Sequence, residues 1–504
     1  AQSQSPALLS EAAHTNLPVG PFALSSIQKW LLQQDIEGRD HWNDAIMLRS
    51  TEGLDSTLLA KALQELVKHH DALRLRFDFQ AHAWQQEYGF QTSDDLLRIV
   101  DLREASEDGI HDQIETIAGA TQGRLSIRQG ALMRAVHFDL GPDRPGRLLL
   151  IVHQLVIDDA SWAILLQDLA TAYTALKAAQ EVILPSKTAS YAKWATDRSA
   201  IHEDERQRYA QKLIEAEIPN SGIQADFENP GRNIEGSREI VELTLSQEQT
   251  AALAAQPFSF ETAVASSLTH ALFDQGAEPT FADLHWSGRD IHINTTQTIG
   301  WCERQGPIVL IPAANTNATT EVIGNQISSV KMLRGLGDHG DRLPTPWIRI
   351  RHRENLTDHL RDNPLFDTSN EAVGAVHSPR ALRTHPLELE TTVENGALSL
   401  RWSYSRHWHK LETIERLARC QKEHLQALAK LASEASDDLA VTQRVTVSPF
   451  TVVKKQRKAD HAKAAHEQGT QRLAEEARLA EEARLAEEAR LAEEARLAEE
   501  ARLA

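Results

Sequence analysis

The feature that most restricts the fold is a short apolar run, RLLLIV at residues 147–152, which is soon followed by a long amphipathic segment. The turn-like sequence GPDRPG precedes the run and His153 follows it, which is the pattern of a short, fully apolar strand. Residues 161–179, SWAILLQDLATAYTALKAA, have the apolar spacing of an amphipathic helix. A strand of this kind leading into such a helix predicts layers of helix packed on sheet.

The rest of the chain continues this α/β (α+β) character in two halves. Further helices are expected at residues 24–34, 56–70, 106–122, 259–274, 327–336 and 411–431. Further strands are expected at residues 45–50, 73–77, 82–90, 133–140, 238–246, 281–288, 307–312 and 347–351, with a hairpin at 387–405 over an Asn-Gly turn. The alternation lacks a strict strand–helix–strand rhythm. Neither GxGxxG nor GxxxxGK[ST] occurs, so no nucleotide cofactor is indicated.

Charge and composition exclude several classes of function. The formal net charge of the 504 residues is −19 and no block of Lys or Arg stands out, which argues against a nucleic-acid binder. No apolar run is long enough to form a transmembrane helix. The two cysteines, Cys302 and Cys420, are too few for a disulfide framework or a zinc site, so a reducing, cytoplasmic setting and no metal are expected.

The ends of the chain differ from its middle. The first residues lack the charged and apolar regions of a signal peptide. They also lack an initiator Met, so processing and a longer parent protein are both compatible with this start. At the other end RLAEEA repeats as a hexad, which turns successive leucines onto three helix faces and forms no coiled-coil seam. Arg and Glu spaced three and four apart instead favour a single solvated helix, with a spacer, a docking element and a repeat of no specific role as alternatives.

These observations predict five regions. They are a flexible leader at 1–17, an N-terminal lobe at 18–195, a C-terminal lobe at 196–434, a linker at 435–470 and the charged repeat helix at 471–504.

A series of motifs then points to a family. Residues 153–162, HQLVIDDASW, are similar to the signature HHxxxDGxSW and stand between the apolar strand and the amphipathic helix. Other segments follow the family order, namely PFALSSIQKWLLQQ with HWN at 41–43, HHDALRLRF at 69–77, LPSKTASYAKWA at 184–195, TIGW at 298–301 and LRWSYSRHWHKLETIERL at 400–417. The chain therefore resembles the condensation-domain superfamily of nonribosomal peptide synthetases, and within it the epimerization domains, over residues 18–432.

The resemblance implies two chloramphenicol-acetyltransferase-like lobes in a V shape with a tunnel between them. A peptidyl or acyl carrier protein would be the partner, and its phosphopantetheine arm would bring a thioester into the tunnel. No cofactor is implied apart from that arm. Epimerization removes and returns an α-proton, which needs a base, a proton donor and stabilisation of an enolate-like oxygen. In the family the second His of the signature and a Glu from a strand of the other lobe do this work.

This sequence departs from the family at both of those positions. Gln154 replaces the second His, and a carboxamide cannot transfer a proton near neutral pH. His285 stands at the Glu position, and Asp159 replaces the signature Gly. Charged residues also enter two further stretches, ERQ at 303–305 where the family is apolar and aromatic, and WIRIRHREN at 347–355. One open question is whether residues 303–305 fill the space between Gln154 and His285.

Other signature positions are retained. His153 is expected to be structural and Asp158 to hold the loop through an arginine. Candidates for lining the tunnel are Asp159, Ser161, Trp162, Arg289 and Trp301. For three residues a structural role is the competing interpretation: Trp162 as core, Arg289 as an ion-pair partner and Cys302 as a small buried residue.

Three functions remain open at this point. The first is a catalytically degenerate epimerization-like domain that is retained for binding or for architecture. The second is an active epimerase-like or acyl-transfer enzyme in which His285 acts as the base, since an imidazole is suited to proton transfer near neutral pH. The third is an assembly protein that associates with itself through the C-terminal repeat helix.

Overall fold

The computed structural model describes residues 20–89, 95–141, 144–197, 203–289, 293–361 and 363–434. These residues belong to one compact unit of the chain. The predicted leader, linker and repeat helix lie outside the described residues. Self-association through the repeat helix therefore stays a prediction. Among the helices of the described residues, none is both long and apolar enough to cross a membrane.

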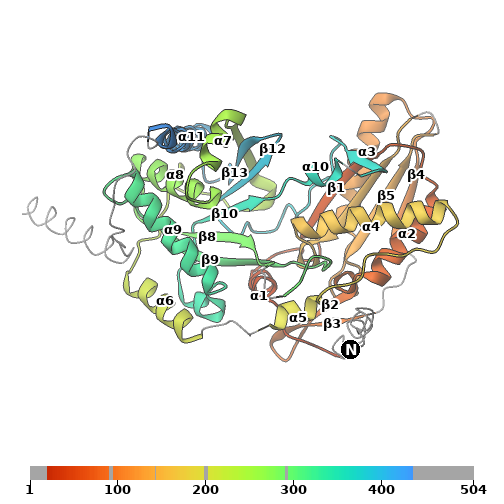
Figure 1. Cartoon of the computed structure of the whole chain (residues 1–504), viewed down its shortest axis with the longest axis horizontal. Coiled ribbons are helices and arrows are strands. Elements are labelled where there is room, and N and C mark those ends of the chain that lie inside the picture. Colours follow the sequence, from red (N-terminus) through yellow and green to blue (C-terminus); the bar gives the residue numbers. More distant parts are fainter. Residues whose placement is uncertain are drawn as a thin grey trace, which may run out of the picture. The chain divides into compact units, whose positions relative to one another are not determined.

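The described chain forms two α/β lobes, each built on its own sheet (Figure 1). The first lobe has a five-stranded sheet in the order β11-β1-β6-β5-β4, made of β1 (Asn43–Ser50), β4 (Leu97–Asp101), β5 (Met133–Asp139), β6 (Arg147–His153) and β11 (Phe366–Thr368). Its helices are α1 (Ser26–Gln33), α2 (Ser56–His69), α3 (Glu107–Gln122), α4 (Asp159–Lys177) and α5 (Tyr191–Thr196). A separate hairpin pairs β2 (Leu75–Gln80) with β3 (Ala83–Tyr88).

The second lobe has a six-stranded sheet in the order β7-β13-β12-β10-β8-β9. Its strands are β7 (Arg238–Thr244), β8 (Thr280–Ser287), β9 (Glu303–Leu310), β10 (Ile348–Arg353), β12 (Leu387–Glu394) and β13 (Ala397–Ser405). The helices of this half are α6 (Glu203–Glu215), α7 (Gln247–Ala254), α8 (Phe260–Asp274), α9 (Thr316–Met332), α10 (Leu356–Leu360) and α11 (Leu411–Glu434). The two-lobed mixed fold predicted from the sequence is therefore confirmed.

The apolar run RLLLIV forms β6 at the centre of the first sheet, and its alternate residues pack into two different cores. Leu148 and Leu150 join the core that contains α2 and α4, whereas Leu149 and Ile151 join the core that contains α3. All four side chains are fully buried. A strand covered on both faces has no solvent-facing position, which is why the residues of this run after Arg147 are all apolar.

The second sheet has two unlike faces, because successive side chains of a strand point to opposite sides. On β10, Ile348 and Ile350 pack into the core beneath α8, α9 and α11. Arg349, Arg351 and Arg353 alternate with these residues and point to the opposite face, where all three line a cavity. This charged face positions the candidate functional site.

Two elements extend further than the sequence indicated. Helix α9 begins at Thr316 rather than at residue 327, because the side chain of Asn315 caps it by accepting a hydrogen bond from the amide of Ala318. Strand β9 begins at Glu303 rather than at residue 307, since polar residues before Pro307 continue the pairing with β8. Six further elements, β4, α5, α6, α7, α10 and β11, were not predicted.

The two halves of the chain exchange segments. Strand β11 belongs to the second half but pairs with β1 in the first sheet, where Phe366 lies opposite Ser50. Trp301 and Cys302 from the second half also pack into the first lobe's core. The boundary between residues 195 and 196 stays a prediction. Strand β11, Trp301 and Cys302 lie after this boundary in the chain but pack in the first lobe.

Two glycines give a matched test of packing at helix ends. Gly276 follows α8 and Gly335 follows α9, both with φ of +77°. A Cβ on Gly335 would lie 2.3 Å from the carbonyl oxygen of Gln305, whereas one on Gly276 would meet nothing within 4 Å. Replacing either glycine by alanine costs roughly 1–2 kcal/mol for the left-handed backbone. We expect Gly335→Ala to lower the free energy of unfolding by at least ~1 kcal/mol more than Gly276→Ala, because of this backbone clash.

Urea denaturation of the two variants measures the difference. Equal losses of stability would contradict the close approach of α9 to β9.

Candidate functional site

His153 is held as a neutral structural residue. Its ring is buried, and Nδ1 accepts a hydrogen bond from the amide of Leu155 at 3.2 Å. The proton is then on Nε2, which donates to the carbonyl of Arg39 at 2.9 Å. Burial lowers the pKa of His153 to about 4, against a smaller opposing effect of that carbonyl. Both ring nitrogens are thus engaged in holding the loop after β6.

Asp158 caps α4 and also joins the two lobes. Its carboxylate accepts hydrogen bonds from the amide and the hydroxyl of Ser161 at 2.8 and 2.6 Å. Arg289, which follows β8 of the second lobe, donates to both carboxylate oxygens at 2.7 and 3.1 Å. The amide of Cys302 donates to Asp158 at 3.0 Å. The expected loop-holding arginine is therefore Arg289, in a buried bidentate pair.

Gln154 and His285 face the same cavity. The cavity has a volume of about 340 Å³, and its wall contains Gln154 from the first lobe with His285 and Trp301 from the second half. The backbone amide of Gln154 donates to the carbonyl of Trp42 at 2.9 Å, which fixes the start of the loop. The sequence thus brings the two altered positions together as the resemblance implied, with a carboxamide in place of the imidazole.

His285 lies between two carboxylates. Its Nε2 is 3.5 Å from Oδ2 of Asp283, and its Nδ1 is 4.0 Å from Oε2 of Glu303. Burial alone would lower the pKa of His285, but these two carboxylates outweigh it and raise the pKa above its usual value. A ring that stays protonated to higher pH can donate a proton but cannot accept one. The two carboxylates thus favour the imidazolium form of His285, in which the ring acts as a proton donor.

The arginines of β10 are paired with carboxylates on neighbouring elements. Arg351 contacts the carboxylate of Glu303, which burial tends to neutralise and Arg351 keeps charged, so that the pKa of Glu303 is well below its usual value. Arg349 lies 3.4 Å from a carboxylate oxygen of Glu388 and from one of Glu390. Because strand alternation puts these arginines on one face, the charges form a connected network.

The unusual residues of this sequence pair with one another. Asp159, which replaces the signature Gly, accepts hydrogen bonds from Nη2 and Nε of Arg353 at 2.6 and 3.0 Å. Arg353 also reaches Asp44 of β1 at 3.0 Å. Arg351 lies 3.5 Å from Asp159 in addition to its contact with Glu303. Four departures from the family pattern thus make one connected set of ion pairs, and those of Asp159 join the two lobes.

These pairs stand between two cavities. A second cavity of about 220 Å³ has Asp159, Glu261 and Trp286 in its wall. It shares His285, Glu303 and Arg351 with the first cavity. Of residues 303–305, Glu303 lines both cavities, whereas the guanidinium of Arg304 lies over the ring of Trp194 at 5.2 Å.

The other tunnel candidates have different places. A third cavity, of about 630 Å³, is lined by Arg289 together with Ala160, Ile164 and Glu354. Trp301 faces the first cavity, where its Nε1 donates to Glu303 at 3.2 Å. Ser161 is engaged by Asp158 and Arg289, and Trp162 is 1% exposed in the core. The core interpretation of Trp162 therefore matches its position, and Cys302 is likewise fully buried.

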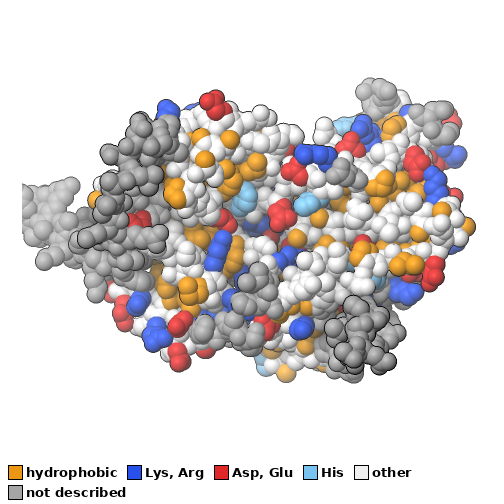
Figure 2. Space-filling model, viewed as in Figure 1, with side chains coloured by type: hydrophobic (Ala, Val, Ile, Leu, Met, Phe, Trp, Pro, Cys, Tyr) orange, Lys and Arg blue, Asp and Glu red, His pale blue; other side chains and the backbone are white. Residues whose placement is uncertain are grey.

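Charged side chains gather visibly at this place. Figure 2 shows acidic, basic and histidine side chains near the middle of the displayed face, where the ribbons of the two lobes meet in Figure 1.

The roles of Arg349, Arg351 and Arg353 were missed from the sequence. The signal was their period of two in a strand, together with acids at positions where the family has none.

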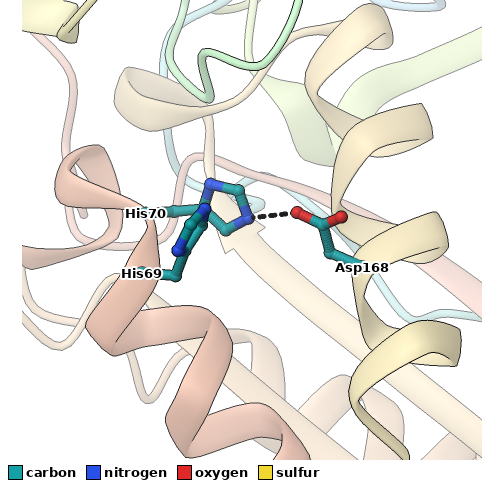
Figure 3. Close-up of side chains that lie close together, drawn as sticks. All are labelled: His69, His70 and Asp168. Atoms are coloured by element: carbon teal, nitrogen blue, oxygen red, sulfur yellow. Dashed lines mark hydrogen bonds and ion pairs between the residues drawn. The ribbon is translucent and has the colours of Figure 1, made fainter. Parts of the chain in front are cut away.

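The His pair of the HHDALRLRF segment lies in a different place. His69 ends α2 and His70 caps it, and Nε2 of His70 is 2.9 Å from Oδ2 of Asp168 on α4 (Figure 3). Both His70 and Asp168 are buried. The pair links α2 to α4 within the first lobe.

Comparison with known proteins gives the family. The sequence matches the profile of the condensation domain over residues 20–446. It is similar to one chain of the linear gramicidin synthase of Brevibacillus parabrevis, with 30% identity over 456 residues that cover 85% of this chain and 6% of that protein. Another chain of the same synthase is 29% identical over 430 residues, which cover 79% of this chain and 8% of that protein. The protein thus spans less than a tenth of these relatives' length.

Solved structures resemble the fold. The epimerization domain from the third module of tyrocidine synthetase B has a TM-score of 0.69 and 24% identity, covering 82% of this chain and 97% of that domain. The X-domain from teicoplanin biosynthesis has a TM-score of 0.65 and 18% identity, covering 82% of this chain and 96% of that one. At such identities the likeness concerns the fold.

The buried pair of Glu303 and Arg351 is expected to be coupled energetically. Removing one partner of a buried ion pair costs about 3–5 kcal/mol because it leaves a charge uncompensated. We expect Glu303→Gln and Arg351→Met each to destabilise the protein by several kcal/mol on that scale, and the double variant to lose less than the sum, with a coupling of about 0.5–3 kcal/mol. Urea denaturation of the four proteins measures this coupling.

A second cycle on Arg49 and Asp367 is the control, since this pair is 2.9 Å apart but about half exposed, at 49% and 53%. Its coupling should stay below ~1 kcal/mol. Additive losses at Glu303 and Arg351 would contradict the proposed network.

The charge of His285 gives a pH-dependent contribution to stability. Because its folded-state pKa is raised, this contribution is complete below the unfolded value of about 6.5 and is lost as the pH rises through the folded value. We expect the stability difference between the wild type and His285→Asn to shrink as the pH rises from about 6 to about 9. A difference that grows over this range would indicate a neutral ring at the lower pH.

Proposed function

The chain belongs to the condensation-domain family of nonribosomal peptide synthetases, and we propose that it is an epimerization-type member that has lost proton transfer and is retained for binding or for architecture. The observation that carries this proposal is the set of ion pairs in the wall of the cavity that Gln154 and His285 also line. Where a thioester and two proton-transfer groups would have to meet, Glu303 and Arg351 contact each other and Asp159 contacts Arg353.

The loss of rate follows from the residues at the two altered positions. General acid and base groups contribute about 10²–10⁴-fold each, and Gln154 can supply neither function. The loop itself is intact, since His153 and Asp158 keep their hydrogen bonds and Asp158 keeps its bidentate pair with Arg289. A preserved scaffold around a changed centre supports a binding or structural role over a second chemistry.

The alternative is an active epimerase-like or acyl-transfer enzyme that uses His285 as a lone base. Two observations weigh against it. The carboxylates of Asp283 and Glu303 raise the pKa of His285 and so favour its protonated form, in which the ring cannot accept a proton. The partner group on the opposite side would be Gln154, which cannot return the proton.

For the partner we propose a peptidyl or acyl carrier protein with a phosphopantetheine arm, supplied by another chain or another region. This rests on the resemblance and on relatives that belong to peptide synthases. A structure with this fold, the X-domain from teicoplanin biosynthesis, has been solved in complex with OxyB, which illustrates that such a scaffold can hold another protein. We also propose a cytoplasmic location, since both Cys302 and Cys420 are free thiols.

Hydrogen exchange at the substrate tests the proposal. An aminoacyl-phosphopantetheine thioester is incubated with the protein in deuterated water, and deuterium at Cα is followed by mass spectrometry. We expect incorporation at the rate of a protein-free sample. The epimerization domain of tyrocidine synthetase B serves as the positive control for the substrate.

Two histidine variants make the outcome specific. His285 and His385 are both buried and both lie near Asp283, at 3.5 and 3.7 Å, but of the two only His285 is in the wall of the first cavity. Protein-dependent label that disappears in His285→Ala and persists in His385→Ala would overturn the proposal in favour of the active enzyme.

A further inference from the structure

Three groups capable of binding a metal lie together in the second lobe, and the ring of His270 stacks on one of them. Helix α8 carries His270 and Asp274, and helix α11, which packs against it, carries Cys420 and His424. The members of each pair are four residues apart, so both side chains lie on one face of their helix. Two such pairs therefore meet across a single helix–helix contact.

The distances within this group are close to those of a coordination site. Nε2 of His424 is 2.8 Å from Oδ2 of Asp274, and Sγ of Cys420 is 3.6 Å from the same oxygen. The potential ligand atoms of these three residues all lie within 4.8 Å of one another. The ring of His270 stacks on that of His424 with centroids 5.2 Å apart.

His270 provides an independent sign of an unmet interaction. Within the described part of the chain, its Nε2 is buried and has no hydrogen-bond partner. A buried ring nitrogen without a partner costs free energy, and coordination of an ion would satisfy it. Burial and the neighbouring His424 lower the pKa of His270, so the ring is neutral and its lone pair is available near neutral pH.

We propose that Asp274, Cys420 and His424, with His270 as the fourth ligand, bind one divalent transition-metal ion of the zinc type. Thiolate, imidazole and carboxylate are the ligands that Zn²⁺ takes in proteins, in a tetrahedral arrangement. Bonds of about 2.0–2.3 Å place the ligand atoms of such a site roughly 3.3–3.8 Å apart. Among Asp274, Cys420 and His424, the distances between ligand atoms need only small side-chain shifts to reach this range.

The helices already hold the required register. The side chain of Gln421, next to Cys420, is buried and donates to the carbonyl of Val264 on α8 at 3.2 Å. The site is also accessible, because the side chain of Asp274 is 51% exposed and that of His424 is 26% exposed. An ion can therefore enter from solvent without opening the fold, and it would cross-link α11 to α8.

The thiol sets the pH dependence of binding. Burial, together with Asp274, raises the pKa of Cys420 to about 11. The metal must displace this proton, so the affinity should rise with pH. The sequence alone did not indicate this site, because its two halves, HxxxD and CxxxH, lie far apart in the chain. Asp274 and His424 are separated by 150 positions.

A second group, His69, His70 and Asp168, also has ligand atoms within reach of one another (Figure 3). It is a weaker candidate, since His70 and Asp168 are buried and already satisfy each other at 2.9 Å. It contains no thiol, so it serves as the internal control.

Titration of the reduced, full-length chain with Co²⁺ tests the site. We expect a thiolate-to-cobalt charge-transfer band in the near ultraviolet and intense visible bands of a tetrahedral ion, both lost on adding Zn²⁺. Cys420→Ser should remove the charge-transfer band. His424→Gln should weaken binding by more than the roughly 10–100-fold that loss of an outer-shell partner costs. His69→Gln should leave the titration unchanged.

Circular dichroism without metal verifies that each variant is folded. Three results would each overturn the proposal. They are cobalt binding without a thiolate charge-transfer band, a charge-transfer band that persists in Cys420→Ser, and an unchanged cobalt affinity in His424→Gln.

Discussion

A charge taken out of water has to be paired inside the protein, and this constraint shapes the centre of the molecule. One face of the second sheet is apolar and buried beneath helices. The opposite face carries Arg349, Arg351 and Arg353 on β10, with Glu388 and Glu390 on the neighbouring strand β12. Because β10 pairs with β12 so that Arg349 lies beside Glu388 and Arg351 beside Glu390, the strand register itself places each cation next to an anion. Desolvating such charges costs several kcal/mol per ion unless they are paired.

Two adjacent residues of one loop use this principle in different ways. Asp158 pairs with Arg289 and also caps α4, so its role is structural in any member that keeps the signature loop. Asp159 is an addition, and its partner Arg353 comes from the segment that also departs from the family. A charge gained on one lobe is thus matched by a charge gained on the other. The two charges therefore satisfy each other across the lobes.

Much of this could be predicted from sequence, for identifiable reasons. The run that forms β6 and the helix after it have patterns that only a buried strand and an amphipathic helix satisfy. The motif order placed Gln154 and His285 at one cavity, where the structure has them. The role of the arginines of β10 could not be predicted. A strand of alternating Ile and Arg has the same sequence pattern whether its polar face meets solvent or another lobe. Strand β9 was predicted too short for the same reason, since Glu303 reads as the end of a strand although it is 7% exposed.

The crossing strand β11 has a consequence for how such domains can be divided. It adds to the edge of β1, which would otherwise present unpaired backbone groups. Phe366 fills the interior beneath that edge and is 1% exposed. A fragment ending near residue 195 would therefore have an open sheet margin and a vacant space in its interior. In module swapping, the two lobes are best exchanged together as an indivisible cassette, with no junction placed between them.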